Sequence, residues 1–164
     1  MKIGVLSDTH LRSPHPVLDF ILEELFAGTD MILHAGDIVT RSVLERLEER
    51  GVIAVSGNMD DYEVAGLLPN MRVIPADGKR IGLIHGWGSK DGLKKRIVER
   101  FPAPKPDVIV FGHSHVPFWG RVDGISMFNP GAAHIRGARG TGTVGILEIA
   151  GDEMEGKVIS LDQG

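Results

Sequence analysis

The sequence predicts a mixed α/β layered fold in which βαβ units come first and hairpins follow. Over the first sixty residues, short apolar runs alternate with stretches of helical periodicity, which predicts parallel strands joined by right-handed crossovers. Beyond residue 70, Asp-Gly or Gly-Asp pairs separate neighbouring apolar runs, which indicates hairpins. No repeat, linker or low-complexity segment divides the 164 residues, so we expect one domain over 1–164.

The first sixty residues are expected to form three strands and two helices. The first helix is expected at 16–27, where apolar residues recur at helical spacing. The second helix begins with a capping box formed by Ser42 and Glu45, and Gly51 ends it. The strands are short apolar runs that stop at polar residues. They are expected at 2–7, 30–35 and 52–56.

The rest of the chain is expected to combine hairpins with one further helix. Asp77-Gly78 is a strong turn signal between the apolar runs 71–76 and 79–84. A helix is expected at about 90–101, because its apolar residues fall on one side. Further strands are expected at 107–111, 117–122, 125–129, 142–149 and 153–161, with turns at Asp123-Gly124 and Gly151-Asp152.

The composition restricts the partners and the metal chemistry. A formal charge of -4 argues against a broad nucleic-acid surface, although bound metal ions would reverse the local sign for a small phosphorylated substrate. The chain has no cysteine, so any metal must take His, Asp, Glu or Asn ligands. The absence of cysteine also fits a cytoplasmic protein. The apolar run in MKIGVLSDTH is too short for a signal peptide or a membrane span.

Side chains that can bind metal follow five of the expected strands, in most cases beside a glycine. Because the carboxyl ends of parallel strands share one edge of a sheet, these side chains would converge there. The neighbouring glycines let the backbone turn tightly and approach a ligand closely. The residues are Asp8 and His10 after 2–7, Asp37 after 30–35, Asn58 after 52–56, His85 after 79–84, and His113 and His115 after 107–111.

The donor set favours two transition-metal ions over a single calcium ion. Two carboxylates, one amide oxygen and four imidazoles suit manganese, which we expect, or zinc, iron, nickel and cobalt, whereas calcium prefers oxygen alone. Seven ligands are too many for one ion in ordinary geometry. Two ions roughly 3.5–4 Å apart that share a carboxylate would hold a phosphoryl group between them and activate a water.

These motifs, in this order, resemble those of the calcineurin-like metallophosphoesterases. The short chain resembles their small bacterial and archaeal phosphodiesterase branch. The resemblance runs from residue 3 to about 133, and it implies a sandwich of two mixed β-sheets flanked by helices. The motifs are Asp8-x-His10, Gly36-Asp37, Gly57-Asn58-x-Asp60, His85-Gly86 and Gly112-His113-x-His115, with Asn129-Pro130-Gly131 as a further one.

The resemblance also implies roles for the seven residues in a phosphodiester hydrolase. A hydroxide bridging the two metals would attack phosphorus in line, and Asp37, Asn58 and His85 would belong to the catalytic set. The first metal would bind Asp8, His10 and His115, the second would bind Asn58, His85 and His113, and Asp37 would bridge them.

Position 59 departs from the larger superfamily. Many members have a histidine after the Gly-Asn pair, and that histidine is thought to protonate the leaving group. Met59 cannot transfer a proton. The small phosphodiesterase branch commonly lacks this histidine too, so hydrolysis is still expected. The proton would then come from water, or good leaving groups would be preferred. Asp60 is expected to be structural.

The other histidines and one arginine receive separate interpretations. His34 is expected to be a satisfied core residue or a support for the metal ligands. His15 lies between two prolines and is expected to be exposed. His134 could reach the site or lie on the surface. Arg12 could meet a phosphate, and a solvated surface position is equally compatible with the sequence.

Three aromatic residues follow metal motifs. Trp87, Phe118 and Trp119 could line a substrate pocket, although ordinary packing is the favoured interpretation. The basic run 94–96 is expected to lie on the exposed face of its helix.

Two other classes of function compete with the enzyme. One is a non-catalytic scaffold like the retromer subunit that resembles this fold, and the other is a regulatory protein that uses metals only to hold phosphate. All seven positions carry competent donors, which favours the enzyme. Hairpin edges could also pair across a homo-oligomer, although no pattern requires it.

Overall fold

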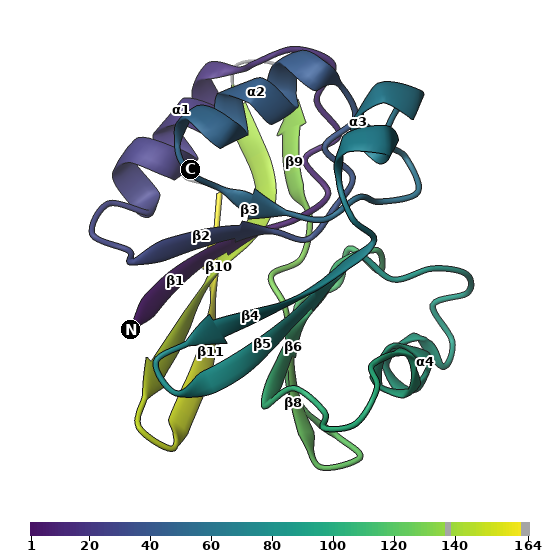
Figure 1. The fold of residues 1–164 in the computed structure, drawn as a ribbon. Helices are drawn as coiled ribbons and strands as arrows, with labels where there is room; N and C mark the ends of the chain where they lie inside the picture. The colour runs from purple at the N-terminus through teal and green to yellow at the C-terminus, as the bar shows by residue number, and fades with distance from the viewer. Residues whose placement is uncertain (137–138, 162–164) are drawn as a thin grey trace.

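Two mixed β-sheets lie face to face at the centre of the molecule, and helices cover the outer side of each (Figure 1). The computed structural model describes residues 1–136 and 139–161, without the side chains of 134–136 and 139–141. This architecture confirms the expected layered sandwich with βαβ units in the first part of the chain.

The first sheet contains the parallel βαβ part of the chain and the last hairpin. Its strand order is β11-β10-β1-β2-β3, and β9 pairs with β10. Strands β1, β2 and β3 are parallel, whereas β10 runs antiparallel to β1 and to β11. The strands are β1 Lys2–Leu6, β2 Met31–His34, β3 Ile53–Ala54, β9 Ala133–Arg136, β10 Arg139–Ala150 and β11 Glu153–Ser160.

The second sheet begins with the expected Asp77-Gly78 hairpin. Both turn residues have positive φ, 51° for Asp77 and 78° for Gly78, as a tight turn of this kind requires. The strand order is β4-β5-β6-β8-β7, in which β5, β6 and β8 are parallel. The strands are β4 Met71–Ala76, β5 Lys79–Ile84, β6 Val108–Val110, β7 Phe118–Val122 and β8 Ile125–Asn129.

Alternation along the strands divides the core into layers. In β1, Ile3 and Val5 face the second sheet, while Leu6 packs toward the helices. A third cluster joins the second sheet to α4 around Ile97 and Phe101. Strands buried on both faces explain why the sequence shows continuous apolar runs. The helices are α1 Pro16–Phe20, α2 Arg41–Glu49, α3 Tyr62–Leu67 and α4 Leu93–Arg100, and the π-helix η1 Ile21–Leu25 continues α1.

The predicted capping box at Ser42 is wrong. The N-cap of α2 is Thr40, and Ser42 lies inside the helix. The carboxylate of Glu45 accepts a hydrogen bond from Arg41 Nε at 2.9 Å. That i,i+4 pair occupies the side chain that would have reached back to the cap.

Several other boundaries differ from those predicted. Strand β3 keeps two residues of the expected 52–56, and β10 starts three residues before 142. The second half of the first helix is a π-helix, in which the Phe26 amide donates to Ile21 O at 2.9 Å. Helix α3 and strand β9 were not predicted. None of the helices in the described part of the chain has the length and apolar character to cross a membrane.

Candidate metal centre

The loops after β1, β2 and β6 carry the candidate ligands on a left-handed backbone. Such conformations cost about 1–3 kcal/mol each for residues other than glycine, and they cluster at functional sites. The amide of Asp8 donates to Gly36 O at 3.0 Å, which joins the first two loops. The amide of His10 adds a second link by donating to Asp37 O at 3.1 Å. The positive φ values are 54° at Asp8, 49° at His10, 59° at Asp37, 66° at His113 and 61° at His115.

Two glycines allow the loops to approach one another. A Cβ atom on Gly57 would overlap Asp37 Oδ1, and one on Gly112 would overlap Ser7 Oγ. The motif glycines at these positions therefore leave space for the carboxylates of the site. Neither glycine has a positive φ, so the requirement here is close approach and not an unusual turn.

Four of the predicted ligands form one cluster, which we call the first donor group: Asp8, His10, Asp37 and His115. One ligand atom from each lies within 4.8 Å of the others. His115 Nε2 is 3.1 Å from Asp8 Oδ1, and His10 Nε2 is 3.4 Å from Asp37 Oδ2. Both carboxylates are almost completely buried, with 0% of Asp8 and 2% of Asp37 exposed.

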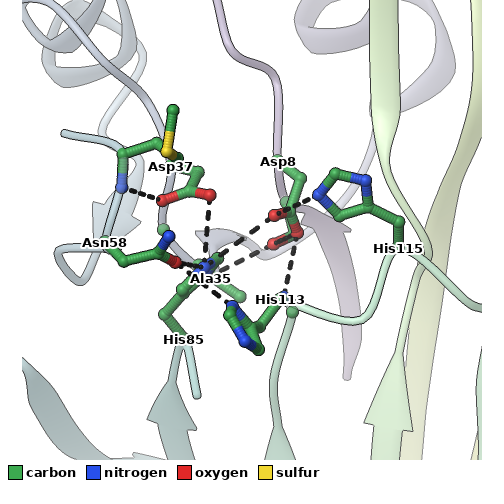
Figure 2. A network of polar contacts seen from close by, with 12 residues as sticks. Asp8, Ala35, Asp37, Asn58, His85, His113 and His115 are labelled. Carbon is green, nitrogen blue, oxygen red and sulfur yellow. Dashed lines mark hydrogen bonds and ion pairs between the residues drawn. The ribbon is translucent and has the colours of Figure 1, made fainter. Parts of the chain in front are cut away.

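The other three predicted ligands, Asn58, His85 and His113, form the second donor group beside the first (Figure 2). Asn58 Oδ1 lies 3.0 Å from His85 Nε2 and 3.1 Å from His113 Nδ1. His85 Nε2 is also 3.3 Å from Asp37 Oδ2, so Asp37 touches both groups. All seven predicted residues come together, but from strand ends of two sheets and not from the edge of one.

Backbone carbonyls determine which ring nitrogen of each second-group histidine faces the site. A carbonyl oxygen can only accept, so His85 Nδ1 donates to Ala35 O at 2.7 Å and His113 Nε2 donates to Gly88 O at 2.8 Å. In its metal-binding neutral form, each ring would turn the lone pair of its other nitrogen, His85 Nε2 or His113 Nδ1, toward Asn58 Oδ1, which is itself an acceptor. Three lone pairs converging at about 3 Å favour a cation between them.

The first donor group has unsatisfied atoms that also fit a cation. Asp8 Oδ1 and His10 Nε2 are buried, and neither makes a hydrogen bond of ordinary geometry among the described residues, although His115 Nε2 forms an ion pair with Asp8 Oδ1 at 3.1 Å. The other oxygen of Asp8 accepts from Ser7 Oγ at 2.5 Å and from the His113 amide at 3.2 Å, which aims Oδ1 into the site. Buried polar atoms are rarely left without partners, so a metal ion suits these donors.

The charges in the site shift each other's pKa values. Burial alone would raise the pKa of Asp8, but His10, His85 and Ser7 outweigh it and lower the pKa to about 2. Asp8 and then Asp37 raise the pKa of His10 against the effect of burial. Burial would lower the pKa of His85, yet Asp37 and Asp8 raise it. Protons and metal ions therefore compete for these imidazoles.

Two residues outside the donor set brace its loops. Asp60 accepts from the amides of Val39 at 2.8 Å and Gly57 at 2.7 Å, which confirms the structural role expected for it. Asn129 Nδ2 donates to Gly112 O and to Ser114 Oγ, both at 3.0 Å. The loop that carries His113 and His115 is thus held from β8. The Asn-Pro-Gly motif was the sequence signal for this brace.

The structure assigns His34 to the support of these loops, as expected. Burial lowers its pKa to about 3, so the ring is neutral. Its Nδ1 accepts from the Gly36 amide at 3.1 Å, which leaves Nε2–H to donate to Thr9 Oγ1 at 3.1 Å. The ring therefore joins the loops after β1 and β2.

The remaining polar residues lie in different places. His15 is half-buried and not exposed as predicted, because its Nδ1 accepts from the Val17 amide and caps α1. Arg12 is exposed. The side chain of His134 lies outside the described residues, so its role stays a prediction.

The aromatic residues separate into two environments. Trp87 is 40% exposed and lines a cavity beside Asn58 and His85. Trp119 instead packs against Phe128 at 5.9 Å between ring centroids, and Phe118 packs against Phe111. The packing interpretation is thus supported for these two residues and not for Trp87.

The prediction that the basic run 94–96 lies on an exposed face holds for Lys95 and fails for Lys94 and Arg96, which are half-buried. Lys94 Nζ lies 4.5 Å from the centroid of the Phe118 ring. The Arg96 guanidinium donates to the carbonyls of Trp87 and Ser89 at 2.6 Å each. Sequence periodicity could not reveal this, because the acceptors belong to an irregular loop.

Comparison with known proteins agrees with this geometry. A family model described as the calcineurin-like phosphoesterase superfamily domain matches residues 1–152. A probable metallophosphoesterase of Methanocaldococcus jannaschii is 35% identical over 136 residues, which span 80% of this chain and 68% of the relative. The phosphodiesterase YfcE of Escherichia coli K12 is 30% identical over an alignment of 174 positions, which covers 90% of this chain and 88% of the relative. The solution structure of a Thermotoga maritima protein superposes with a TM-score of 0.72 at 31% identity, covering 97% of this chain and 98% of the other.

Proposed function

The chain belongs to the calcineurin-like phosphoesterase superfamily, and we propose that it is a phosphodiesterase that works with two divalent metal ions. The observation that carries this proposal is the position of Asp37 between two converging donor groups. Its Oδ2 lies 3.4 Å from His10 Nε2 in one group and 3.3 Å from His85 Nε2 in the other. A carboxylate in that place suits a bridge between two ions.

Each donor group would hold one ion. Asp8, His10 and His115 would bind the first, Asn58, His85 and His113 would bind the second, and Asp37 would bind both. When bound, the two ions would supply positive charge for the phosphoryl group and an activated water. The nitrogen and oxygen donors suit manganese, and also zinc, iron, nickel or cobalt.

The chain itself contributes orientation and exclusion of water. Ser7 holds one oxygen of Asp8, so the other oxygen stays directed into the site. The Met59 amide donates to Asp37 Oδ1 at 2.8 Å, which leaves Oδ2 toward the histidines. Because both carboxylates are buried, their interaction with cations is screened less than it would be in water.

The side chain at position 59 favours substrates with good leaving groups. Met59 is 55% exposed beside Asn58 and has no proton to give. Water would therefore protonate the leaving oxygen, which slows reactions that need a strong general acid. The relative named as a phosphodiesterase makes diesters the first class of substrate to test.

Activity after metal removal and metal replacement tests the proposal. Protein treated with a chelator should lose turnover of an aryl phosphodiester, and added Mn²⁺ should restore it. Metal analysis should find two ions for each chain in the active form. Undiminished turnover by protein shown to be metal-free would contradict the proposal, and two bound ions without turnover on diesters, monoesters or nucleotides would favour a scaffold or a phosphate-binding regulator.

We further expect the protein to act on a small phosphorylated substrate in the cytoplasm. The formal charge of -4 gives no broad attraction for nucleic acid. Cell fractionation would test the location, and size-exclusion chromatography with light scattering would test for a homo-oligomer.

A further inference from the structure

A cavity of about 330 Å³ opens beside the second donor group. Asn58 and His85 belong to its lining and also to the candidate metal ligands. A phosphoryl group held by the metals would therefore place one of its ester substituents at the mouth of this cavity. The volume is within the range of small-molecule sites in proteins.

The lining of the cavity includes a set of apolar side chains, which we call the apolar wall, and a set of polar side chains, which we call the donor wall. Met71, Ile84 and Trp87 form the apolar wall, and the indole is 40% exposed. The guanidinium of Arg96 lies 5.7 Å from the centroid of that indole, over the ring, and helps to hold it in place. An indole face beside aliphatic side chains suits a flat aromatic group.

The donor wall consists of Ser56, Asn70 and Arg100. Ser56 Oγ donates to Asn70 Oδ1 at 2.7 Å. This bond fixes the orientation of the amide and leaves its NH₂ group to donate. Arg100 adds a positive charge at an exposed position of the lining. Both groups would attract oxygen or nitrogen acceptors at the far edge of a bound ring.

We propose that this cavity is the binding site for an aromatic ester substituent that carries an acceptor or anionic group on its far edge. The proposal rests on the proposed phosphodiesterase function and names the substrate class: aryl or heteroaryl phosphoesters. Trp87 supplies the stacking surface, and Arg100 selects the acceptor edge.

Binding of three phosphate esters to the Mn²⁺-loaded protein tests this site by calorimetry. Methyl phosphate, phenyl phosphate and 4-carboxyphenyl phosphate share the phosphate and differ only in the substituent. Phenyl phosphate should bind roughly tenfold more tightly than methyl phosphate because of stacking. The carboxyl group should add a further gain through Arg100.

Three variants separate the two walls. Trp87→Ala should abolish the preference for phenyl over methyl phosphate. Arg100→Gln should remove only the gain from the carboxyl group. Arg121→Gln is the matched control, because Arg121 is an exposed arginine that lines a different cavity, and it should leave all three affinities unchanged.

The outcomes distinguish the cavity from the metal centre. Equal binding of methyl and phenyl phosphate, or a preference that survives Trp87→Ala, would overturn the cavity assignment and leave the phosphodiesterase proposal intact. If none of the three esters binds, the cavity assignment fails, and metal analysis with turnover of an aryl phosphodiester then decides the metal-centre proposal separately. A preference for aryl esters in a protein that does not turn over an aryl phosphodiester would support the cavity and count against the enzyme.

A different set of contacts connects Arg96 to a candidate metal ligand. Its Nη2 donates to Trp87 O and to Ser89 O, both at 2.6 Å. Gly88 lies between these two residues, and its carbonyl accepts from His113 Nε2 at 2.8 Å. Arg96 therefore fixes the peptide that orients the His113 ring.

We also infer that Arg96 is a positioning residue for the second metal ion. The fixed fork of the guanidinium reaches three carbonyls of this loop, because Nη1 also donates to Asp91 O at 3.3 Å, and the shorter amide of glutamine and the single ammonium of lysine do not reproduce that fork. Residues that orient ligands contribute about 10–100-fold to metal affinity. Arg96→Lys and Arg96→Gln should lower the affinity for the second ion by a factor in that range and leave the affinity for the first ion unchanged.

Calorimetric titration of metal-free protein with Mn²⁺ tests this inference without any assay of turnover. Lys95→Gln is the control, because Lys95 is the exposed neighbour on α4. Unchanged affinity for both ions would overturn the inference. Equal weakening of both ions together with a lower melting temperature would also overturn it, since that pattern indicates a merely structural role.

Discussion

The two donor groups share Asp37 but differ in how the chain keeps them in place. The first group contains a second buried carboxylate, Asp8, and its atoms Asp8 Oδ1 and His10 Nε2 make no hydrogen bond of ordinary geometry among the described residues. The second group adds only an amide and two imidazoles, which Ala35 O and Gly88 O orient. In the proposed centre, charge would hold the first ion, whereas the orientation of an amide and two imidazoles would hold the second. We therefore expect the first site to fill before the second.

Removal of the shared carboxylate should have the largest effect. Asp37→Ala should lower the affinity of the protein for both ions and lower kcat at least about a hundredfold. Two bound ions would stabilise the transition state by several kcal/mol. Metal analysis and hydrolysis of an aryl diester check this together. If the variant retains two ions and normal turnover, Asp37 does not link the two donor groups.

Substitutions in only one group should separate the two ions. Asn58→Ala should leave one tightly bound ion, since Asn58 Oδ1 lies against His85 and His113, the other two members of the second group. Asp8→Asn keeps the shape of the side chain and removes its charge, so it should lower the affinity for the first ion more than the affinity for the second. Titration with Mn²⁺ of both variants measures the difference. Identical losses of the two ions in both variants would show that the site behaves as one unit.

The pH dependence of stability should reverse when metal is bound. The raised pKa values of His10 and His85 stabilise the metal-free protein below their ordinary value of 6.5, and this contribution is lost as the pH rises through the raised values. Metal binding displaces the same protons, so its contribution grows with pH.

Urea unfolding between pH 6 and 9 measures this reversal, with and without Mn²⁺. The metal-free midpoint should fall with pH, and the shift caused by Mn²⁺ should increase. His10→Gln should flatten the metal-free profile. A shift by Mn²⁺ that stays constant with pH would contradict competition between protons and metal.

Substitution of Met59 should have the smallest effect, because the residue is 55% exposed and its hydrogen bond to Asp37 comes from the backbone amide, which a substitution keeps. Met59→Ala should change kcat modestly and leave the melting temperature unchanged. Met59→His should increase turnover mainly for diesters with poor leaving groups. A Met59→Ala variant as inactive as Asp37→Ala would assign the side chain a role that the contacts do not support.

Local signals in the sequence predicted the layered fold and seven side chains that the structure brings together. Each donor follows a short apolar run, so the strand end that carries it is visible in the chain. The sequence could not assign the strands to two sheets, nor the left-handed backbone at residues such as Asp8 and His115, because those depend on contacts between distant loops. Helix α3 was missed because its six residues bury only Val64, too few for a periodic pattern.

The sequence also could not predict how the histidine rings are oriented. The ring of His113 is set by Gly88 O, 25 residues away, and that carbonyl by Arg96 on α4. The periodicity of α4 indicated only an exposed basic face, since periodicity describes which side of a helix is buried and not what its polar side chains bind.

Stepwise addition of Mn²⁺ to metal-free protein, with bound metal and diester hydrolysis measured at each step, tests the two-ion site most directly. Two ions should bind for each chain, and turnover should rise with the second ion and not with the first. Asn58→Ala should stop at one ion and stay inactive. Full turnover with one ion bound, or with none, would contradict a centre built on a shared Asp37.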